Sequence, residues 1–181
     1  MDTLIIHPAD KTTDFLKPIY QSIQSKTVIT GGLSTGEVLT LIDSHDRVIM
    51  MGHGSPRGLF SVGVFYDLCG YVIDKDAVSL LKEKKGSIFI WCDADQFIRR
   101  HKLNGFSTGM FISEIRESVQ CGLKDITQEM VDESNNAFGK ILNRIINNTS
   151  ATVYKNLKEE YLEVAMSNPV AAYNYPRLFF R

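Results

Sequence analysis

The sequence has few cysteines and lacks the spacing of a disulfide-stapled or metal-binding fold. Its 181 residues contain three cysteines, Cys69, Cys92 and Cys121, without the pair spacing of disulfides or a zinc ribbon. His7, His45 and His101 show no ligand spacing with each other or with cysteine, so we expect no metal. Free thiols persist in a reducing cytoplasm, which is the expected location. Cys69 and Cys121 are expected to be structural thiols.

Long apolar runs and an excess of one charge are also missing. No stretch approaches the roughly 20 apolar residues of a membrane span, and the N-terminal run stops at Pro8, unlike a signal peptide. The net charge is −1, and no basic run alternates with aromatic residues. We therefore expect neither a membrane nor a nucleic acid as partner. The 44% hydrophobic content suits one soluble domain over residues 1–181.

Short apolar runs alternate with amphipathic stretches along most of the chain. Strands buried on both faces of a parallel sheet read as continuous apolar runs. The pattern predicts an α/β fold, a three-layer sandwich with a mainly parallel sheet and helices on both faces. The four expected strands are Leu4–His7, Thr27–Thr30, Arg47–Met51 and Ser87–Trp91. Residues 59–64 and 71–73 are expected to form the arms of a surface hairpin.

Helical periodicity and capping residues predict the remaining elements. Ser34 and Glu37 match a capping box, and Asp74 can cap another helix. The apolar residues Ile112, Ile115 and Val119 are expected to form one face of a third helix. One more helix is expected over 12–23, and two helices are expected beyond Thr127. A fifth strand is expected over 106–111, and an edge strand in the tail 168–181.

Two residues with reactive side chains directly follow predicted strands. His53 follows the third strand, between two glycines, and Cys92 follows the fourth. Ligands of open α/β sheets bind beyond the carboxyl ends of strands. A right-handed crossover of this length can return the fourth strand beside the third. We therefore expect His53 and Cys92 to face one another.

A cysteine beside a histidine is an arrangement for nucleophilic catalysis. His53 can take the thiol proton and later protonate a leaving amine, while the amides of Gly54 and Cys92 can stabilise an oxyanion. The alternative for each residue alone is structural, because free cysteines often fill core space and a histidine between glycines can sit in a turn. The pairing at successive strand ends favours the dyad.

The arrangement resembles the clan that contains caspases, gingipains, separases and CHAT domains. The segments that carry the likeness to CHAT domains are HGSPRGLF, SIFIWC, VDESNNAFGKILNRIINN, ATVYKNLKEEYLEVA and NPVAAYNYPRLFF. In caspases the histidine precedes the cysteine by about 50 residues. The sequence differs from these families directly before the cysteine, where a small residue is usual and Trp91 stands here. With a bulky residue at this position, the shape of the substrate pocket does not follow from the resemblance.

The resemblance implies a caspase-like fold and endopeptidase activity, with His53 as base and Cys92 as nucleophile. Asp93 and Asp95 can then receive a basic substrate side chain, or they can cap the next helix. Ser55, after the His-Gly pair, is a further expected substrate contact. Peptides or proteins are the expected substrates, and a regulatory partner or ligand is consistent with the family.

Two other functions remain open. One is a catalytically inactive module of the same fold that binds a peptide or partner. The other is a small-molecule or nucleotide sensor on a doubly wound sheet, for which the glycine-rich segment 31–36 before a helix can hold a phosphate. That segment lacks the Walker lysine and the GxGxxG order, which favours a plain loop with a helix cap, and we expect no cofactor.

Overall fold

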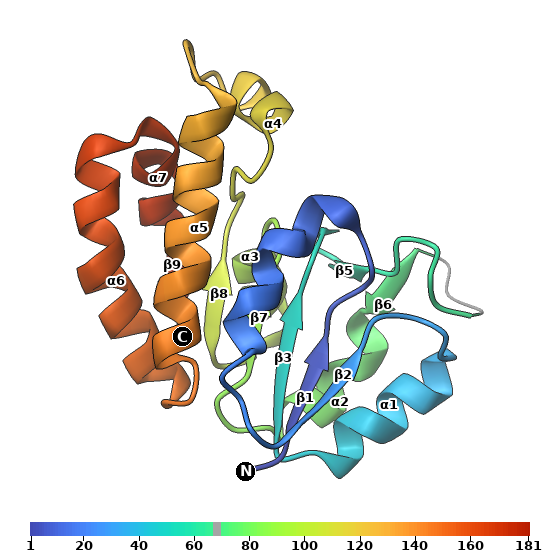
Figure 1. Ribbon diagram of the computed structural model, residues 1–181. Coiled ribbons are helices and arrows are strands. Elements are labelled where there is room, and N and C mark those ends of the chain that lie inside the picture. Colours follow the sequence, from blue (N-terminus) through green and yellow to red (C-terminus); the bar gives the residue numbers. More distant parts are fainter. Residues whose placement is uncertain (67–69) are drawn as a thin grey trace.

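A six-stranded sheet forms the centre of the protein in the computed structural model, which describes residues 1–66 and 70–181 (Figure 1). Cys69 lies outside the described residues. The strand order is β2-β1-β3-β7-β8-β9, with the first five strands parallel and β9 antiparallel to β8. The strands are β1 (Thr3–Ile6), β2 (Lys26–Ile29), β3 (Arg47–Met51), β7 (Ile88–Ile90), β8 (Phe106–Thr108) and β9 (Leu178–Phe180).

Helices cover both faces of this sheet, because each central strand buries side chains on both sides. Within β3, Ile49 and Met51 join one apolar cluster, and Val48 and Met50 join another. The first cluster lies under η1, a 3-10 helix, and under α5, α6 and α7; the second lies under α1, α2 and α3. These observations confirm a mixed α/β fold built on a mainly parallel sheet.

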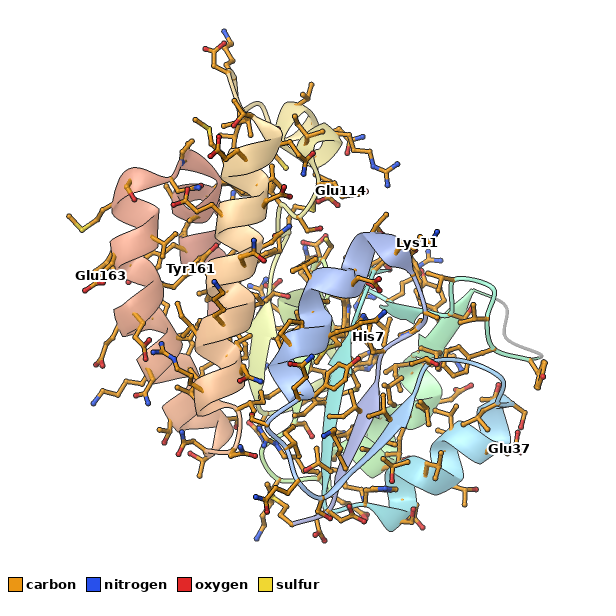
Figure 2. All side chains as sticks on the ribbon, in the orientation of Figure 1. His7, Lys11, Glu37, Glu114, Tyr161 and Glu163 are labelled. Carbon is orange, nitrogen blue, oxygen red and sulfur yellow. The ribbon has the colours of Figure 1, made fainter. Side chains whose placement is uncertain are left out.

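The helices mostly follow their sequence signals. The capping box of Ser34 and Glu37 forms at the start of α1, where Figure 2 labels Glu37. The helical elements are η1 (Lys11–Tyr20), α1 (Thr35–Ser44), η2 (Lys75–Ala77), α2 (Val78–Leu81), α3 (Ala94–His101), α4 (Ile115–Gln120), α5 (Gln128–Ile145), α6 (Ser150–Ser167), α7 (Pro169–Asn174) and η3 (Tyr175–Arg177). In the described parts of the chain, no helix combines the length and apolar character needed to cross a membrane.

Several expected elements differ from the structure. The stretch expected as an ordinary helix over 12–23 is the 3-10 helix η1, which contains Pro18. Proline lacks an N–H and clashes with the carbonyl four residues earlier, which disfavours an α-helix here. The expected hairpin is present, because β5 (Gly58–Phe60) and β6 (Tyr71–Ile73) pair antiparallel, but its first arm ends at Phe60 and β4 (Gly54–Ser55) adds a third strand.

The prediction was least accurate between β8 and α5. Strand β8 ends at Thr108, so the expected strand over 106–111 is too long. The helix expected from Ile112 begins only at Ile115. Ile112 is fully buried in a small separate cluster, whereas Ile115 and Val119 are exposed. The three residues do not form one helical face, because Ile112 packs from a segment before the helix begins. In the tail, the expected edge strand is present as β9, after the unexpected helix α7.

Candidate functional site

His53 and Cys92 lie at the same edge of the sheet, just beyond two adjacent strands. Strands β3 and β7 are parallel neighbours, with Met51 opposite Ile90, so the residues that follow them emerge side by side. Both residues line one cavity of about 20 Å³, together with residues from η1 and from the loop after β8. That volume holds about one water molecule. The structure therefore brings the two residues to one small cavity.

Trp91 joins the two strand-end loops to each other. Its indole is buried beneath α3, between Phe89 and Phe97. The indole Nε1 donates to the carbonyl of Ser55 at 3.1 Å. A Cβ on Gly54 would lie 2.2 Å from Cδ1 of Trp91, so only glycine allows this contact. The bulky residue before Cys92 thus belongs to the core and fixes the loop of His53 relative to that of Cys92.

The histidine side of the cavity is polar. His53 Nε2 lies 2.6 Å from the hydroxyl of Thr12, and that hydroxyl donates to Asp10 Oδ1 at 2.7 Å. Asp10 Oδ2 lies 3.9 Å from the same imidazole nitrogen. The backbone and hydroxyl donors of Thr12 lower the pKa of Asp10, and His53 acts in the same direction. Asp10 is therefore a carboxylate at neutral pH, beside the imidazole.

The cysteine side of the cavity is apolar. The thiol of Cys92 donates to the carbonyl of Phe111 at 3.7 Å. Burial raises the pKa of Cys92 to about 11, and the carboxylates of Glu117 and Asp93 act in the same direction. The thiol is consequently protonated at neutral pH. In the part of the chain that the structure describes, no hydrogen bond joins Cys92 to His53.

The backbone at Cys92 makes a sharp turn from β7 into α3. Asp93, at the N-cap position of α3, has a φ of 64° and makes no side-chain capping bond. This left-handed conformation is uncommon for a residue with a side chain, although Asp tolerates it better than most. Among the described residues, the Cys92 N–H has no hydrogen-bond partner. It can therefore serve as a donor to a bound group.

Two of the expected substrate contacts are engaged elsewhere. Asp95 is buried in the first turn of α3, pairs with Arg99 at 2.5 Å, and lines a different cavity of about 290 Å³ beside β9. The Ser55 hydroxyl lies 3.1 Å from that of Tyr71 and accepts from the amide of Arg57 at 3.1 Å. Both contacts hold Ser55 in the small sheet. Gly54 lies in β4, directly after His53.

Four residues at the site were not singled out from the sequence, namely Asp10, Thr12, Phe111 and Glu117. A usable signal existed for Asp10, because it follows the first predicted strand as His53 and Cys92 follow theirs. Glu117 accepts from the amides of Ser113 and Glu114 and closes a capping box on α4. That contact holds the loop that carries Phe111 over the thiol.

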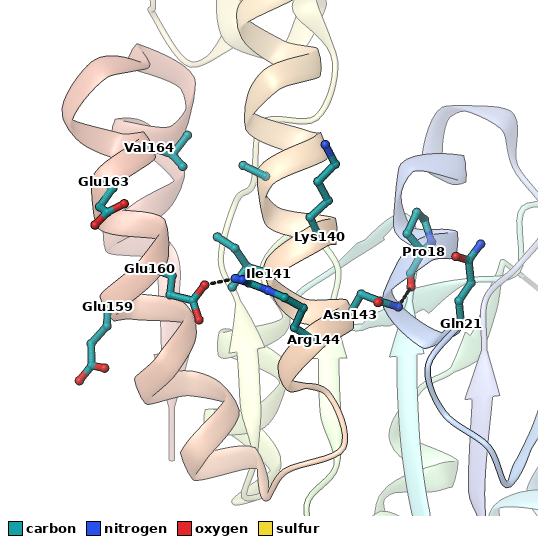
Figure 3. Close-up of a pocket in the computed structure, with 11 residues that line it drawn as sticks. Pro18, Gln21, Lys140, Ile141, Asn143, Arg144, Glu159, Glu160, Glu163 and Val164 are labelled. Carbon is teal, nitrogen blue, oxygen red and sulfur yellow. Dashed lines mark hydrogen bonds and ion pairs between the residues drawn. The ribbon is translucent and has the colours of Figure 1, made fainter.

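Two other features among the described residues, a large cavity and the glycine-rich segment 31–36, contain neither a histidine nor a cysteine. A cavity of about 950 Å³ lies between η1, α5 and α6 (Figure 3). Three of its polar side chains bond within the protein: Arg144 pairs with Glu160, and Asn143 donates to the carbonyl of Pro18. In the glycine-rich segment 31–36, Gly31 packs against Val64, and Ser34 with Glu37 caps α1. His53 and Cys92 therefore remain the candidate site.

No protein-family model matches the sequence, and a search of curated proteins finds no significant match.

Proposed function

We propose that the protein is a caspase-like cysteine endopeptidase and that the structure represents its resting form. The observation that carries the proposal is the placement of His53 and Cys92 in one cavity beyond adjacent parallel strands. The finer assignment of the fold, a caspase-like three-layer sandwich, is part of this proposal. The helices on both faces and the closing strand β9 support it.

The proposed reaction is acyl transfer through a covalent intermediate. The Cys92 sulfur attacks the carbonyl carbon of a peptide bond while its proton passes to the His53 imidazole. The resulting oxyanion accepts hydrogen bonds from the amides of Cys92 and Gly54. The C–N bond then breaks, and His53 returns the proton to the leaving amine. A water molecule, activated by the same imidazole, hydrolyses the thioester and regenerates the thiol.

The resting form requires an opening step before this chemistry. The cavity admits about one water, and the thiol is bonded to Phe111 instead of His53. Because the pKa of Cys92 is about 11, we estimate that roughly one thiol in a thousand is ionised at pH 8. Substrate or a regulatory partner must therefore move the loop that carries Phe111.

A cleavage screen on a peptide library tests the proposal. Cleavage by the wild-type protein should disappear in Cys92→Ser and in His53→Ala. Cleavage should persist in Cys121→Ser, the matched control, because Cys121 is not among the residues that line the cavity. In parallel, Cys92 of the unliganded protein should react with iodoacetamide at pH 8 about 100-fold more slowly than a free thiol with a pKa of about 8.5. Fast labelling would contradict the resting form.

A non-catalytic peptide-binding module is the second candidate, and the buried, protonated thiol favours it. The two candidates differ in their response to a peptidyl acyloxymethyl ketone, which modifies a cysteine only when that cysteine attacks it. A peptidase should become labelled at Cys92. A binding module should leave the probe unreacted, and peptides that it binds should bind equally well to Cys92→Ser. The second pattern, with no cleavage by the wild type, would overturn the endopeptidase proposal.

A further inference from the structure

A chain of two side chains links a carboxylate to His53. The Thr12 hydroxyl has a single hydrogen, and it lies 2.7 Å from Asp10 Oδ1 and 2.6 Å from His53 Nε2. A hydroxyl can donate one hydrogen bond and accept others. It donates to the ionised carboxylate, the stronger acceptor. Its contact with His53 is then one in which the imidazole Nε2–H donates to Thr12.

The opposite arrangement is unfavourable. If His53 carried its proton on Nδ1, the Thr12 hydroxyl would have to donate to Nε2. The Thr12 oxygen and the Asp10 carboxylate would then face one another at 2.7 Å without a proton between them. Two acceptors at that separation repel, and no other described side chain bonds Thr12 Oγ1 in their place. The geometry is therefore consistent with one neutral tautomer of His53.

We propose that Asp10 and Thr12 are positioning residues that keep the proton of neutral His53 on Nε2 and leave Nδ1 as the base. The inference rests on the proposed function for its catalytic meaning and adds to it the residues that orient the base. Nδ1 has no hydrogen-bond partner among the described residues, so its lone pair is available. In the reaction, the proton leaves Sγ of Cys92 and binds Nδ1 of His53.

Asp10 also supports the charged intermediate. Once Nδ1 has gained a proton, the imidazolium keeps its Nε2–H on Thr12, and Asp10 Oδ2 lies 3.9 Å from that nitrogen. Opposite charges at this distance attract, the more so in a partly buried site. Asp10 would act as the aspartate of a Ser-His-Asp triad acts, which fixes the tautomer of the histidine and stabilises the imidazolium. Here the contact to the carboxylate passes through a threonine.

A purely structural role for Asp10 must be separated from this one, since Asp10 is also the N-cap of η1. The chain provides a matched control at η2, another 3-10 helix. There the Asp74 carboxylate accepts from the amide of Asp76 at 2.9 Å, as Asp10 accepts from the amide of Thr12 at 2.9 Å. Asparagine caps helices about as well as aspartate. Asp10→Asn and Asp74→Asn therefore perturb capping equally, but only the first removes a charge near His53.

The first measurement is the tautomer of His53, by ¹⁵N NMR of the histidine rings in the full-length protein at pH 8. The wild type and Asp74→Asn should show protonated Nε2 and unprotonated Nδ1. Thr12→Val should shift His53 towards a mixture of tautomers, Asp10→Asn should do so to a smaller extent, and Thr12→Ser should restore the wild-type spectrum. A wild-type proton on Nδ1, or a spectrum that neither variant changes, would overturn the inference.

The second measurement is the rate at which a peptidyl acyloxymethyl ketone modifies Cys92. Asp10→Asn and Thr12→Val should slow it by about 10- to 100-fold, less than the roughly 10⁴-fold loss that follows removal of a directly bonded aspartate. Asp74→Asn should react like the wild type. The two failures are distinguishable. If wild-type Cys92 never reacts, the proposed function fails while the tautomer result stands. If all variants react equally, the positioning role fails while the function stands.

Discussion

Two neighbouring threonines at the start of η1 each hold a histidine, and the two pairs differ in their surroundings. Thr12 contacts His53, at the end of β3, and the next residue, Thr13, contacts His7, at the end of β1. Figure 2 labels His7 beside η1. The separations between the threonine oxygens and the imidazole Nε2 atoms are similar, 2.6 Å for His53 and 3.0 Å for His7.

His7 has only neutral partners and almost no exposed surface. Its other nitrogen lies 3.2 Å from the Tyr20 hydroxyl, and 2% of the residue is exposed. Burial lowers the pKa of His7 to about 4. The His53 side chain is 23% exposed and has the Asp10 carboxylate nearby. The same kind of hydrogen bond therefore holds a buried histidine among neutral partners in one case and a partly exposed histidine beside a carboxylate in the other.

The largest effect that separates the two pairs is the pH dependence of stability due to His7. Its pKa is about 4 in the folded chain, against an ordinary value of 6.5. Between these values the unfolded chain binds a proton that the folded chain does not, so stability falls as pH falls through this window. His7 should account for a loss of about 3 kcal/mol in the free energy of unfolding from pH 7.5 to pH 4.

Urea denaturation at both pH values checks this prediction. The free energy of unfolding of His7→Gln should fall by about 3 kcal/mol less than that of the wild type over the same interval. Thr13→Val serves as a control that lowers stability but retains the titrating group, and its pH dependence should keep the sign of the wild type. Equal pH dependence in the wild type and His7→Gln would show that His7 is not held neutral by burial.

The sequence permitted correct predictions where the signal is local. Continuous apolar runs such as Arg47–Met51 identified central strands, because strands covered on both faces have no polar side. Ser34 and Glu37 identified the start of α1, because a capping box is contained within four residues. The adjacency of β3 and β7, which carry His53 and Cys92 to one edge, agrees with the tendency of consecutive strands to lie side by side.

The missed features depend on contacts between distant segments. Thr12 and His53 are 41 residues apart, and no periodicity links them. The thiol of Cys92 meets the carbonyl of Phe111, a backbone group that sequence patterns do not reveal. Asp95 is a miss of another kind, because its partner Arg99 stands four residues later on the same helix, a spacing at which side chains pair, so a local signal existed. The orientation of a side chain at a strand end depends on which loop packs over it, and that is a tertiary property.

A smaller effect sharpens the comparison of the two threonines. Thr13 is buried, accepts from His7 and donates to the carbonyl of Asp10 at 3.0 Å. Thr13→Val would leave the buried Nε2–H of His7 without a partner, whereas the Asp10 carbonyl keeps its bond from the amide of Thr13, and the change should cost about 2 kcal/mol of unfolding free energy. Thr12 is exposed, so in Thr12→Val water can bond both His53 and Asp10, and the cost should stay below about 1 kcal/mol. Urea denaturation of both variants at pH 7.5, with Thr12→Ser and Thr13→Ser as conservative controls, measures the difference. If Thr12→Val destabilises the fold as much as Thr13→Val, the contact with His53 is a structural one, and the contrast between the two pairs fails.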